Sequence, residues 1–169
     1  MKRIFIALFA LALVQISVAQ NKIPSVKIKD VAGKEVNTAD LSNDGKPMIL
    51  SFWATWCKPC LKELKAIGDV YTDWVDETGV KLVAISVDDA RSSAKVKTMA
   101  DANGWEYEML LDLNGDFKRA MNVANPPHIF IIDGKGNIVY QHNGYSEGSE
   151  NELIEKVRLL NEGKDISKH

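Results

Sequence analysis

The two cysteines of this chain, Cys57 and Cys60, lie three positions apart in the segment SFWATWCKPC. Thiols at this spacing can exchange between a dithiol and an intramolecular disulfide, which is redox chemistry. Zinc sites also use this spacing, but zinc needs four ligands, and the only histidines that could join the pair are His128, His142 and His169. A structural bridge across so short a loop removes little entropy from the unfolded chain. The sequence therefore favours a redox-active pair over a zinc site or a structural disulfide.

The surroundings of the pair predict which sulfur reacts first. Cys57 lies where an apolar segment ends and a helix is expected to begin, so the free N–H groups of the first turn favour a thiolate and lower the pKa of its thiol. Lys58 adds a positive charge nearby, and Pro59 is tolerated in the first turn, where it stiffens the ring. Cys60 follows one turn later and should be less exposed. We therefore expect an attacking thiolate at Cys57 and a resolving thiol at Cys60.

The elements that must position the pair are a strand before it and a helix after it. Residues 47–54 form a continuous apolar run, which is typical of a strand buried on both faces. Residues 58–76 carry apolar side chains at three- and four-residue spacing, which predicts one amphipathic helix. These side chains are Leu61, Leu64, Ile67, Val70, Tyr71 and Trp74.

Strand-like and helix-like segments alternate along the rest of the chain. Further strands are expected at 80–88, 107–112 and 128–133, and further helices at 93–103, 115–123 and 149–162. The last helix is expected to begin with a hydroxyl cap from Ser149, paired with Glu152. Hairpins around Gly33 and at 133–137 add antiparallel strands. The predicted fold class is therefore α/β, with a central mixed β-sheet flanked by helices on both faces.

Residues 1–19 have the features of a cleaved export signal. Lys2 and Arg3 precede an apolar run, and small residues at the end of the segment suit cleavage after Ala19. The uninterrupted apolar run covers residues 4–14, which is short of the roughly 20 residues that cross a bilayer. The segment is therefore interpreted as a signal peptide rather than a membrane anchor.

The expected mature chain, residues 20–169, is long enough for one domain with its own core. The net charge of the whole chain is −2, and removal of Lys2 and Arg3 makes it more negative. No electrostatic attraction to nucleic acid or anionic lipid is therefore expected. We expect a soluble protein in the periplasm, a compartment in which disulfides persist.

The segment FWATWCKPC resembles the active site of the thioredoxin superfamily, and with the export signal it resembles the exported TlpA/ResA-like thiol-disulfide oxidoreductases. The resemblance extends over about residues 24–163, so residues 20–169 are expected to form one domain with the thioredoxin fold. It implies a redox-active Cys57–Cys60 disulfide as the only redox group, with no other cofactor and no metal. It also implies disulfide-bearing client proteins, a membrane-linked thiol donor, and either cytochrome c maturation or general repair as the task.

The later segment VANPPHIFIIDGKGNIV resembles the part of the superfamily in which a cis-proline begins the strand facing the active site. Its register makes Pro127 the candidate for that proline. The residue before it holds an extended substrate through its backbone, but Pro126 has no N–H and can only accept a hydrogen bond. Trp56, Pro126 and Pro127 are thus expected to bind clients, with a loose and broad grip. His128 is interpreted as a strand-start histidine, and the alternative places it near the sulfurs.

Two positions depart from the common pattern. Ser51 occupies the place of a buried aspartate in many thioredoxins and cannot act as a carboxylate base. The ResA-like branch instead has a glutamate three residues after the second cysteine, and Glu63 matches it on the helical face of Cys60. We interpret Glu63 as the base that takes the proton of Cys60. The alternative is a solvated glutamate beside Lys62. Lys65 stands where a proline is usual, which predicts a straighter helix.

The predicted function is that of a thiol-disulfide oxidoreductase that reduces the disulfides of client proteins. A peroxiredoxin-like peroxidase is the enzymatic alternative, although such a peroxidase does not need a second thiol three residues away. A copper-binding or chaperone module on the same fold is the non-catalytic alternative.

Overall fold

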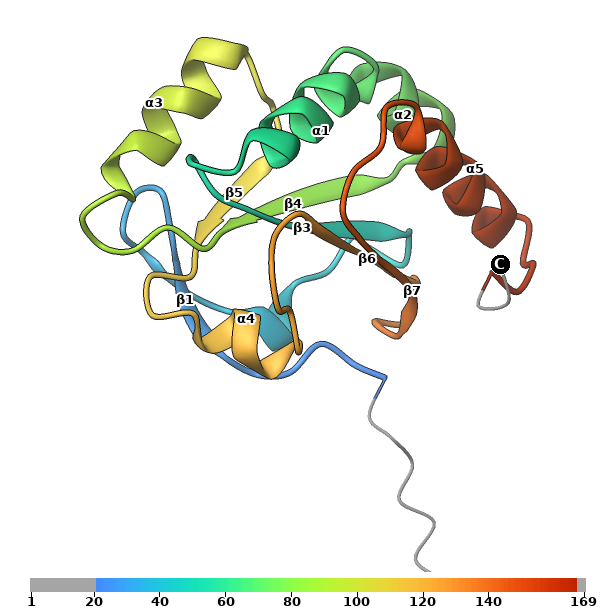
Figure 1. Ribbon diagram of the computed structural model, residues 1–169. Coiled ribbons are helices and arrows are strands. Elements are labelled where there is room, and N and C mark those ends of the chain that lie inside the picture. The colour runs from blue at the N-terminus through green and yellow to red at the C-terminus, as the bar shows by residue number, and fades with distance from the viewer. Residues whose placement is uncertain (1–20, 167–169) are drawn as a thin grey trace, which may run out of the picture.

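A computed structural model describes residues 21–166, and the expected signal peptide lies outside the described residues. Within this range one sheet holds seven strands in the order β2-β1-β5-β4-β3-β6-β7 (Figure 1). The strands are β1 (Lys27–Asp30), β2 (Glu35–Asn37), β3 (Met48–Trp53), β4 (Lys81–Ser86), β5 (Glu108–Leu111), β6 (His128–Ile132) and β7 (Ile138–Asn143). Strands β3, β4 and β5 run parallel, and the other neighbours pair antiparallel. The prediction of a mixed sheet is confirmed.

Helices cover both faces of this sheet, also as predicted, but unequally (Figure 1). They are η1 (Thr38–Asp40), α1 (Lys58–Gly68), α2 (Tyr71–Thr78), α3 (Ala94–Asn103), α4 (Asp116–Ala120) and α5 (Ser149–Asn161). Helices α1, α2, α3 and α5 share one face, and α4 lies on the other. The crossovers from β3 to β4 and from β4 to β5 join parallel strands in one direction, and right-handed crossovers of this kind fall on the same face.

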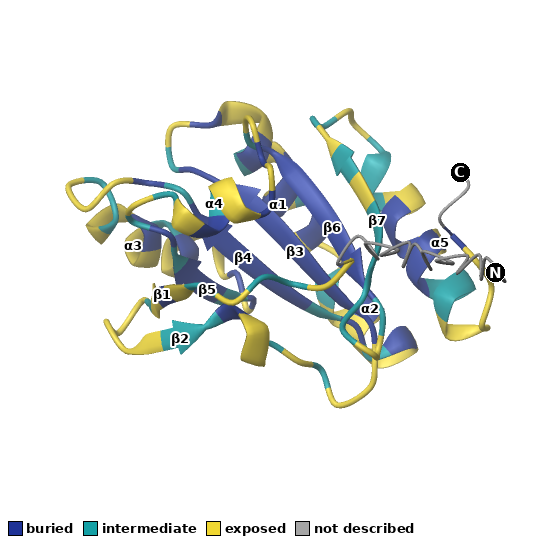
Figure 2. Ribbon diagram, turned by 90° about the horizontal axis from the view of Figure 1, so that it is seen from below, coloured by how far each residue is buried: buried dark blue, intermediate teal, exposed yellow. Residues whose placement is uncertain are grey.

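Strand β3 lies at the centre of the core, which explains its apolar sequence. All six of its residues are buried. Ile49 and Trp53 point to the face covered by α1, whereas Leu50 and Phe52 point to the face of α4 and pack near Phe117. Figure 2 shows that the central strands of the sheet are buried, whereas the outer strands β2 and β7 are more exposed. The sheet thus provides a rigid platform on which β3 ends.

The single helix predicted for residues 58–76 is wrong, because the structure has two helices, α1 and α2. Val70 has φ −128° and ψ 3°, outside the helical range, so the chain bends there. The hydroxyl of Tyr107 donates to the carbonyl of Leu64 at 2.7 Å. A Cβ atom on Gly68 would lie 2.8 Å from that hydroxyl oxygen, so this glycine permits the close approach. Lys65 lies within α1, three residues before its last residue.

Candidate active site

Cys57 and Cys60 are joined as a disulfide at the start of α1, directly after β3. Cys57 is the N-cap residue of this helix, and its Sγ accepts a hydrogen bond from the backbone N–H of Cys60 at 3.3 Å. Pro59 lies in the first turn, as predicted. A sulfur that accepts a helical N–H at a positive helix end is favoured in the thiolate form. The geometry therefore supports Cys57 as the ionised thiol in the reduced protein.

The two sulfurs differ in their access to solvent. The Cys57 side chain belongs to a residue that is 5% exposed, whereas Cys60 is fully buried. Trp56 is 65% exposed beside them, and Lys58 and Pro59 are also exposed. Another protein can thus approach the pair only from the side of Cys57. The predicted platform at Trp56 has the exposure that such contact requires.

A buried carboxylate that the sequence reasoning missed holds the loop before the pair. Asp88 follows β4 and accepts two hydrogen bonds from Thr55, one from its backbone N–H at 2.8 Å and one from the Thr55 hydroxyl at 2.7 Å. It accepts a third from the Ser86 hydroxyl at 2.8 Å. Two of these bonds hold Thr55, the residue that lies two positions before Cys57, and the third ties the carboxylate to the end of β4. The carboxyl ends of neighbouring parallel strands meet at one edge of a sheet, so an aspartate just after the second strand was the available signal.

The peptide bond between Pro126 and Pro127 is cis, which confirms the conformation expected for Pro127. This bond directly precedes β6, whose first residue pairs with Phe52 near the end of β3. The antiparallel pairing therefore brings the two prolines to the sheet edge from which the disulfide also extends. The carbonyl of Pro127 accepts a hydrogen bond from the N–H of Gly144 at 2.9 Å. Pro126 is half-buried, and its missing N–H leaves only its carbonyl for a bound chain.

Glu63 is buried in α1, only 2% exposed, so the interpretation as a solvated side chain is wrong. Burial is the main cause that raises the pKa of its carboxyl to about 8, and the negative charge of Glu150 adds to it. Its Oε2 has no partner among the described residues, and neither has the hydroxyl of Ser51, which is also buried. Ser51 lies between Ile49 and Trp53 on β3 and so faces α1. A carboxyl with this pKa is mostly protonated at neutral pH and becomes able to accept a proton as it ionises near pH 8.

His128 lies on the other face of the sheet from α1. Its ring stacks on Phe130 with 4.6 Å between centroids, and its Nε2 is 3.2 Å from the Gln141 side-chain oxygen. Burial lowers the pKa of this histidine. The interpretation as a strand-start histidine is therefore the better one.

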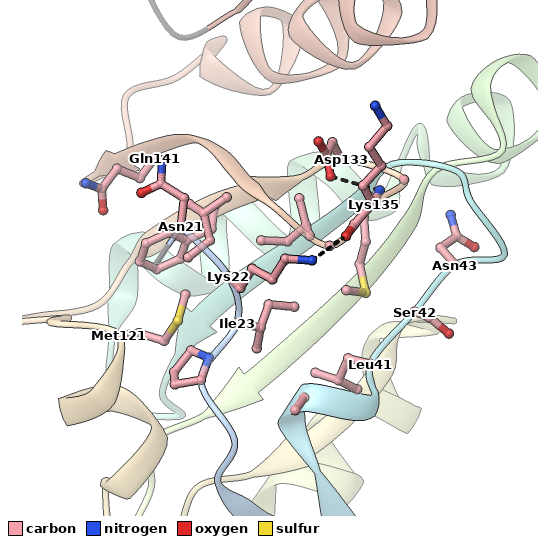
Figure 3. A pocket seen from close by; sticks show the side chains of 18 of the residues that line it. Asn21, Lys22, Ile23, Leu41, Ser42, Asn43, Met121, Asp133, Lys135 and Gln141 are labelled. Carbon is pink, nitrogen blue, oxygen red and sulfur yellow. Dashed lines mark hydrogen bonds between the residues drawn. The ribbon is translucent and has the colours of Figure 1, made fainter. Parts of the chain in front are cut away.

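Two of the hollows on the described surface bear on the site. The one of about 700 Å³ lies beside α1 and is lined by Lys58, Pro59 and Lys62 together with Tyr145 and Glu150. The larger one, of about 1000 Å³, lies between the N-terminal segment, the residues before β3 and the turn after β6 (Figure 3). There the Lys22 ammonium donates to the carbonyl of Lys135. Neither cysteine lines this larger hollow, so it is separate from the redox site.

Residues 21–166 bring together no group of three or more His, Cys, Asp or Glu side chains arranged to hold a metal ion. Within the same part of the chain, no helix has the length and apolar character needed to cross a membrane.

Comparison with known proteins adds three findings. A profile of the AhpC/TSA family matches residues 19–141. The thiol-disulfide oxidoreductase ResA of Bacillus thuringiensis subsp. konkukian is 28% identical over 137 residues, which cover 81% of this chain and 75% of the relative. The thioredoxin-like protein YneN of Bacillus subtilis is 33% identical over 140 residues, 80% of this chain and 76% of the relative.

A solved structure shows the same architecture. The solution structure of an uncharacterized thioredoxin-like protein from Porphyromonas gingivalis is 62% identical and superposes with a TM-score of 0.75. The match covers 83% of this chain and 92% of that one. The predicted thioredoxin fold is confirmed.

Proposed function

This chain belongs to the AhpC/TSA family and is a thiol-disulfide oxidoreductase with a thioredoxin-like fold, and on that premise we propose that it reduces the disulfides of exported client proteins. The observation that carries the proposal is the asymmetric pair at the start of α1. The sulfur of Cys57 accepts a helical N–H and this residue keeps 5% of its surface exposed, whereas Cys60 is fully buried within one turn of it. This arrangement suits attack by the first sulfur and resolution by the second.

In the proposed reaction the Cys57 thiolate attacks one sulfur of a client disulfide. The client S–S bond breaks, a mixed disulfide forms on Cys57, and the other client sulfur leaves as a thiolate. Glu63 takes the proton of Cys60, and the Cys60 thiolate attacks the Cys57 sulfur. The second client sulfur then leaves, and the Cys57–Cys60 bond closes. Two electrons pass from the protein to the client, whose thiolates take up two protons.

The client is proposed to bind across Trp56, Pro126 and Pro127. Trp56 offers exposed apolar surface next to Cys57, and Pro126 offers a backbone carbonyl at the same edge. An extended client segment can pair with that carbonyl but receives no N–H in return. The proposed grip is therefore broad rather than sequence-specific.

Export to the periplasm and cleavage after Ala19 are part of the same proposal. They are supported by the charge and apolar pattern of residues 1–19. A membrane-linked thiol donor would return the pair to the dithiol form after each turnover. Reduction of apocytochrome c before haem attachment is one proposed task, and it rests on the resemblance to ResA-like proteins.

The two alternative functions draw less support from the site. A peroxidase needs one reactive cysteine and no second sulfur one turn away, whereas Cys60 here is bonded to Cys57. A copper-binding module could hold copper(I) with the two thiolates alone, but the described residues add no cluster of three or more possible ligands around them.

A turnover assay separates these functions. Reduced protein should catalyse reduction of a protein disulfide such as that of insulin, in the presence of a thiol donor, and the Cys57→Ser variant should not. Peroxide consumption and copper retention are measured on the same sample. Peroxide turnover or tight copper binding without any disulfide reduction would overturn the proposal.

Client identity is tested by trapping. A Cys60→Ser variant, exported with its own signal, should accumulate clients as mixed disulfides on Cys57 because the resolving thiol is missing. Apocytochrome c among the trapped proteins would support the maturation task. Trapped proteins without any apocytochrome c would contradict that task and leave general repair.

A further inference from the structure

The connection from β7 to α5 lies beside α1. Tyr145, Glu147 and Glu150 from this region line the hollow of about 700 Å³, and Pro59 and Lys62 line it from α1. At its start, the connection is fastened by the hydrogen bond from Gly144 to Pro127. At its end, Glu150 lies in the first turn of α5. Its acidic and phenolic side chains are thus held next to the active-site helix.

Glu63 lies directly behind this hollow. On a helix, residue 63 neighbours positions 59 and 66, and both of these line the hollow. The Glu63 carboxyl itself is turned inward, and its Oε2 has no partner among the described residues. The buried carboxyl of Glu63 and the half-buried carboxyl of Glu150 therefore lie beside the same stretch of α1.

A hydrogen bond holds the outer carboxyl in place. The Tyr145 hydroxyl donates to Oε2 of Glu150 at 3.3 Å. This bond limits the swing of the Glu150 side chain away from α1. Two carboxyl groups held close in this way repel each other when both are ionised, so the drier one keeps its proton to higher pH.

The other groups around Glu63 do not remove this repulsion. From α1, Lys58, Lys62 and Lys65 are all exposed, and Lys65 pairs with Asp69. From α5, the buried Lys156 pairs with Glu152. From the connection, Glu147 is exposed as well. Ser51, which faces α1 from β3, carries no charge. Burial is the larger cause of the raised pKa of Glu63, and the charge of Glu150 is the other cause.

We propose that Glu150, held by Tyr145, is a positioning residue whose negative charge sets the pH at which Glu63 can take the proton of Cys60. The inference rests on the proposed function in one respect, the role of Glu63 as the base. Ionised Glu150 keeps Glu63 protonated below that pH and so delays the attack of Cys60 on the mixed disulfide. Glu150 is not proposed to touch the reacting sulfurs, and its charge acts through Glu63.

The test compares Glu150→Gln with the matched control Glu147→Gln, which removes the same charge from the same hollow. Cys57 is first loaded as a mixed disulfide with thionitrobenzoate, and release of this group by Cys60 is followed from pH 5 to pH 10. Glu150→Gln should shift the midpoint of release down by about half a pH unit, which raises the rate about threefold below the midpoint. Tyr145→Phe should shift the midpoint in the same direction by less. Glu147→Gln should leave it unchanged.

A second readout separates this inference from the base role of Glu63. The Glu63 carboxyl is titrated by carbon NMR in the reduced wild-type, Glu150→Gln and Glu147→Gln proteins. A lower titration midpoint for Glu63 in Glu150→Gln alone supports the inference, even if Glu63→Gln leaves release unchanged and thereby removes Glu63 as the base. Equal Glu63 midpoints in all three proteins overturn the inference, whatever Glu63→Gln does to the rate.

Discussion

Glu63 is an acidic side chain that the fold places where it is protonated at neutral pH. Its carboxyl has an ordinary pKa of 4.5 in the unfolded chain and about 8 in the folded protein, mainly because of burial. The folded state therefore favours the protonated form, and burial of the charged form costs free energy as the pH rises. A residue with this cost is a candidate for function, because stability alone would favour an apolar side chain there.

The cost predicts a pH-dependent stability that Glu63→Gln should remove. Because the folded-state pKa of Glu63 is raised, the contribution of this residue to the free energy of unfolding is most favourable below pH 4.5. It falls as the pH rises towards 8 and is constant above that. The full difference is at most about 5 kcal/mol, from a shift of about 3.5 pKa units. Urea unfolding of the oxidised proteins at pH 5 and pH 9 measures it. The variant should lose less stability between these pH values than the wild type, and equal losses would contradict the assignment.

At the residue scale, Pro126 is proposed to set the strength of client binding. It cannot donate a backbone hydrogen bond, so Pro126→Ala should restore a donor and tighten peptide binding by about 1 kcal/mol, or roughly fivefold. The measurement is the dissociation constant of an extended peptide that carries no cysteine. Unchanged or weaker binding, with the bond before Pro127 still cis, would show that the backbone of residue 126 does not hold clients.

At the scale of elements, the site depends on how the end of β3 is fixed before α1 begins. Asp88 provides this through its bonds to Thr55, across two neighbouring strand ends. Cys57 is also held by its own N–H, which donates to the carbonyl of Ala54 at 3.0 Å, whereas Trp56 between Thr55 and Cys57 is largely exposed. The position of Cys57 is therefore set in part by a carboxylate that is distant in sequence.

Asp88→Ala should accordingly weaken both the fold and the site. It leaves three donors without this acceptor, one of them buried and two part-buried, which should lower the free energy of unfolding by about 2–4 kcal/mol. Thermal and urea unfolding measure the loss. Asp101→Ala is the control, because Asp101 makes an exposed pair with Lys97 that is worth about 0.5 kcal/mol at most. A loss for Asp88→Ala no larger than for Asp101→Ala would show that the anchor is unimportant.

Elements were predictable from the sequence where one pattern had one meaning. The apolar run at 47–54 contains strand β3, and its residues are apolar because both faces of the strand are buried. The spacing over 58–76 did not reveal the break at Val70, since both helices bury the same side. The cap expected at Ser149 is also wrong. Gly148 is the N-cap, in a left-handed conformation, and Ser149 makes no side-chain cap bond.

At the scale of the whole molecule, four segments far apart in sequence meet at one end of the sheet. Parallel pairing of β3 and β4 brings Asp88 to the disulfide, and antiparallel pairing of β3 and β6 brings the two prolines there. The β7–α5 connection then covers the side of α1 (Figure 1). The pair, Pro127 and Glu63 could be predicted because they resemble a known pattern. Asp88, Tyr145 and Glu150 could not, because their place depends on strand order and helix packing.

The whole molecule also makes the two sulfurs unequal, and this inequality is the central claim. Cys60, in the first turn of α1, is fully buried, whereas Cys57 at the helix end keeps 5% of its surface exposed, so we propose Cys57 as the thiol that attacks another disulfide. Oxidised glutathione can therefore report on which sulfur attacks first.

The most direct test compares the rates at which reduced Cys60→Ser and reduced Cys57→Ser form a mixed disulfide with oxidised glutathione at pH 7, followed by mass spectrometry. The single thiol at Cys57, in Cys60→Ser, should react faster than the single thiol at Cys60 by about tenfold or more, because it is both more ionised and more accessible. Equal rates, or faster reaction at Cys60, would contradict the account.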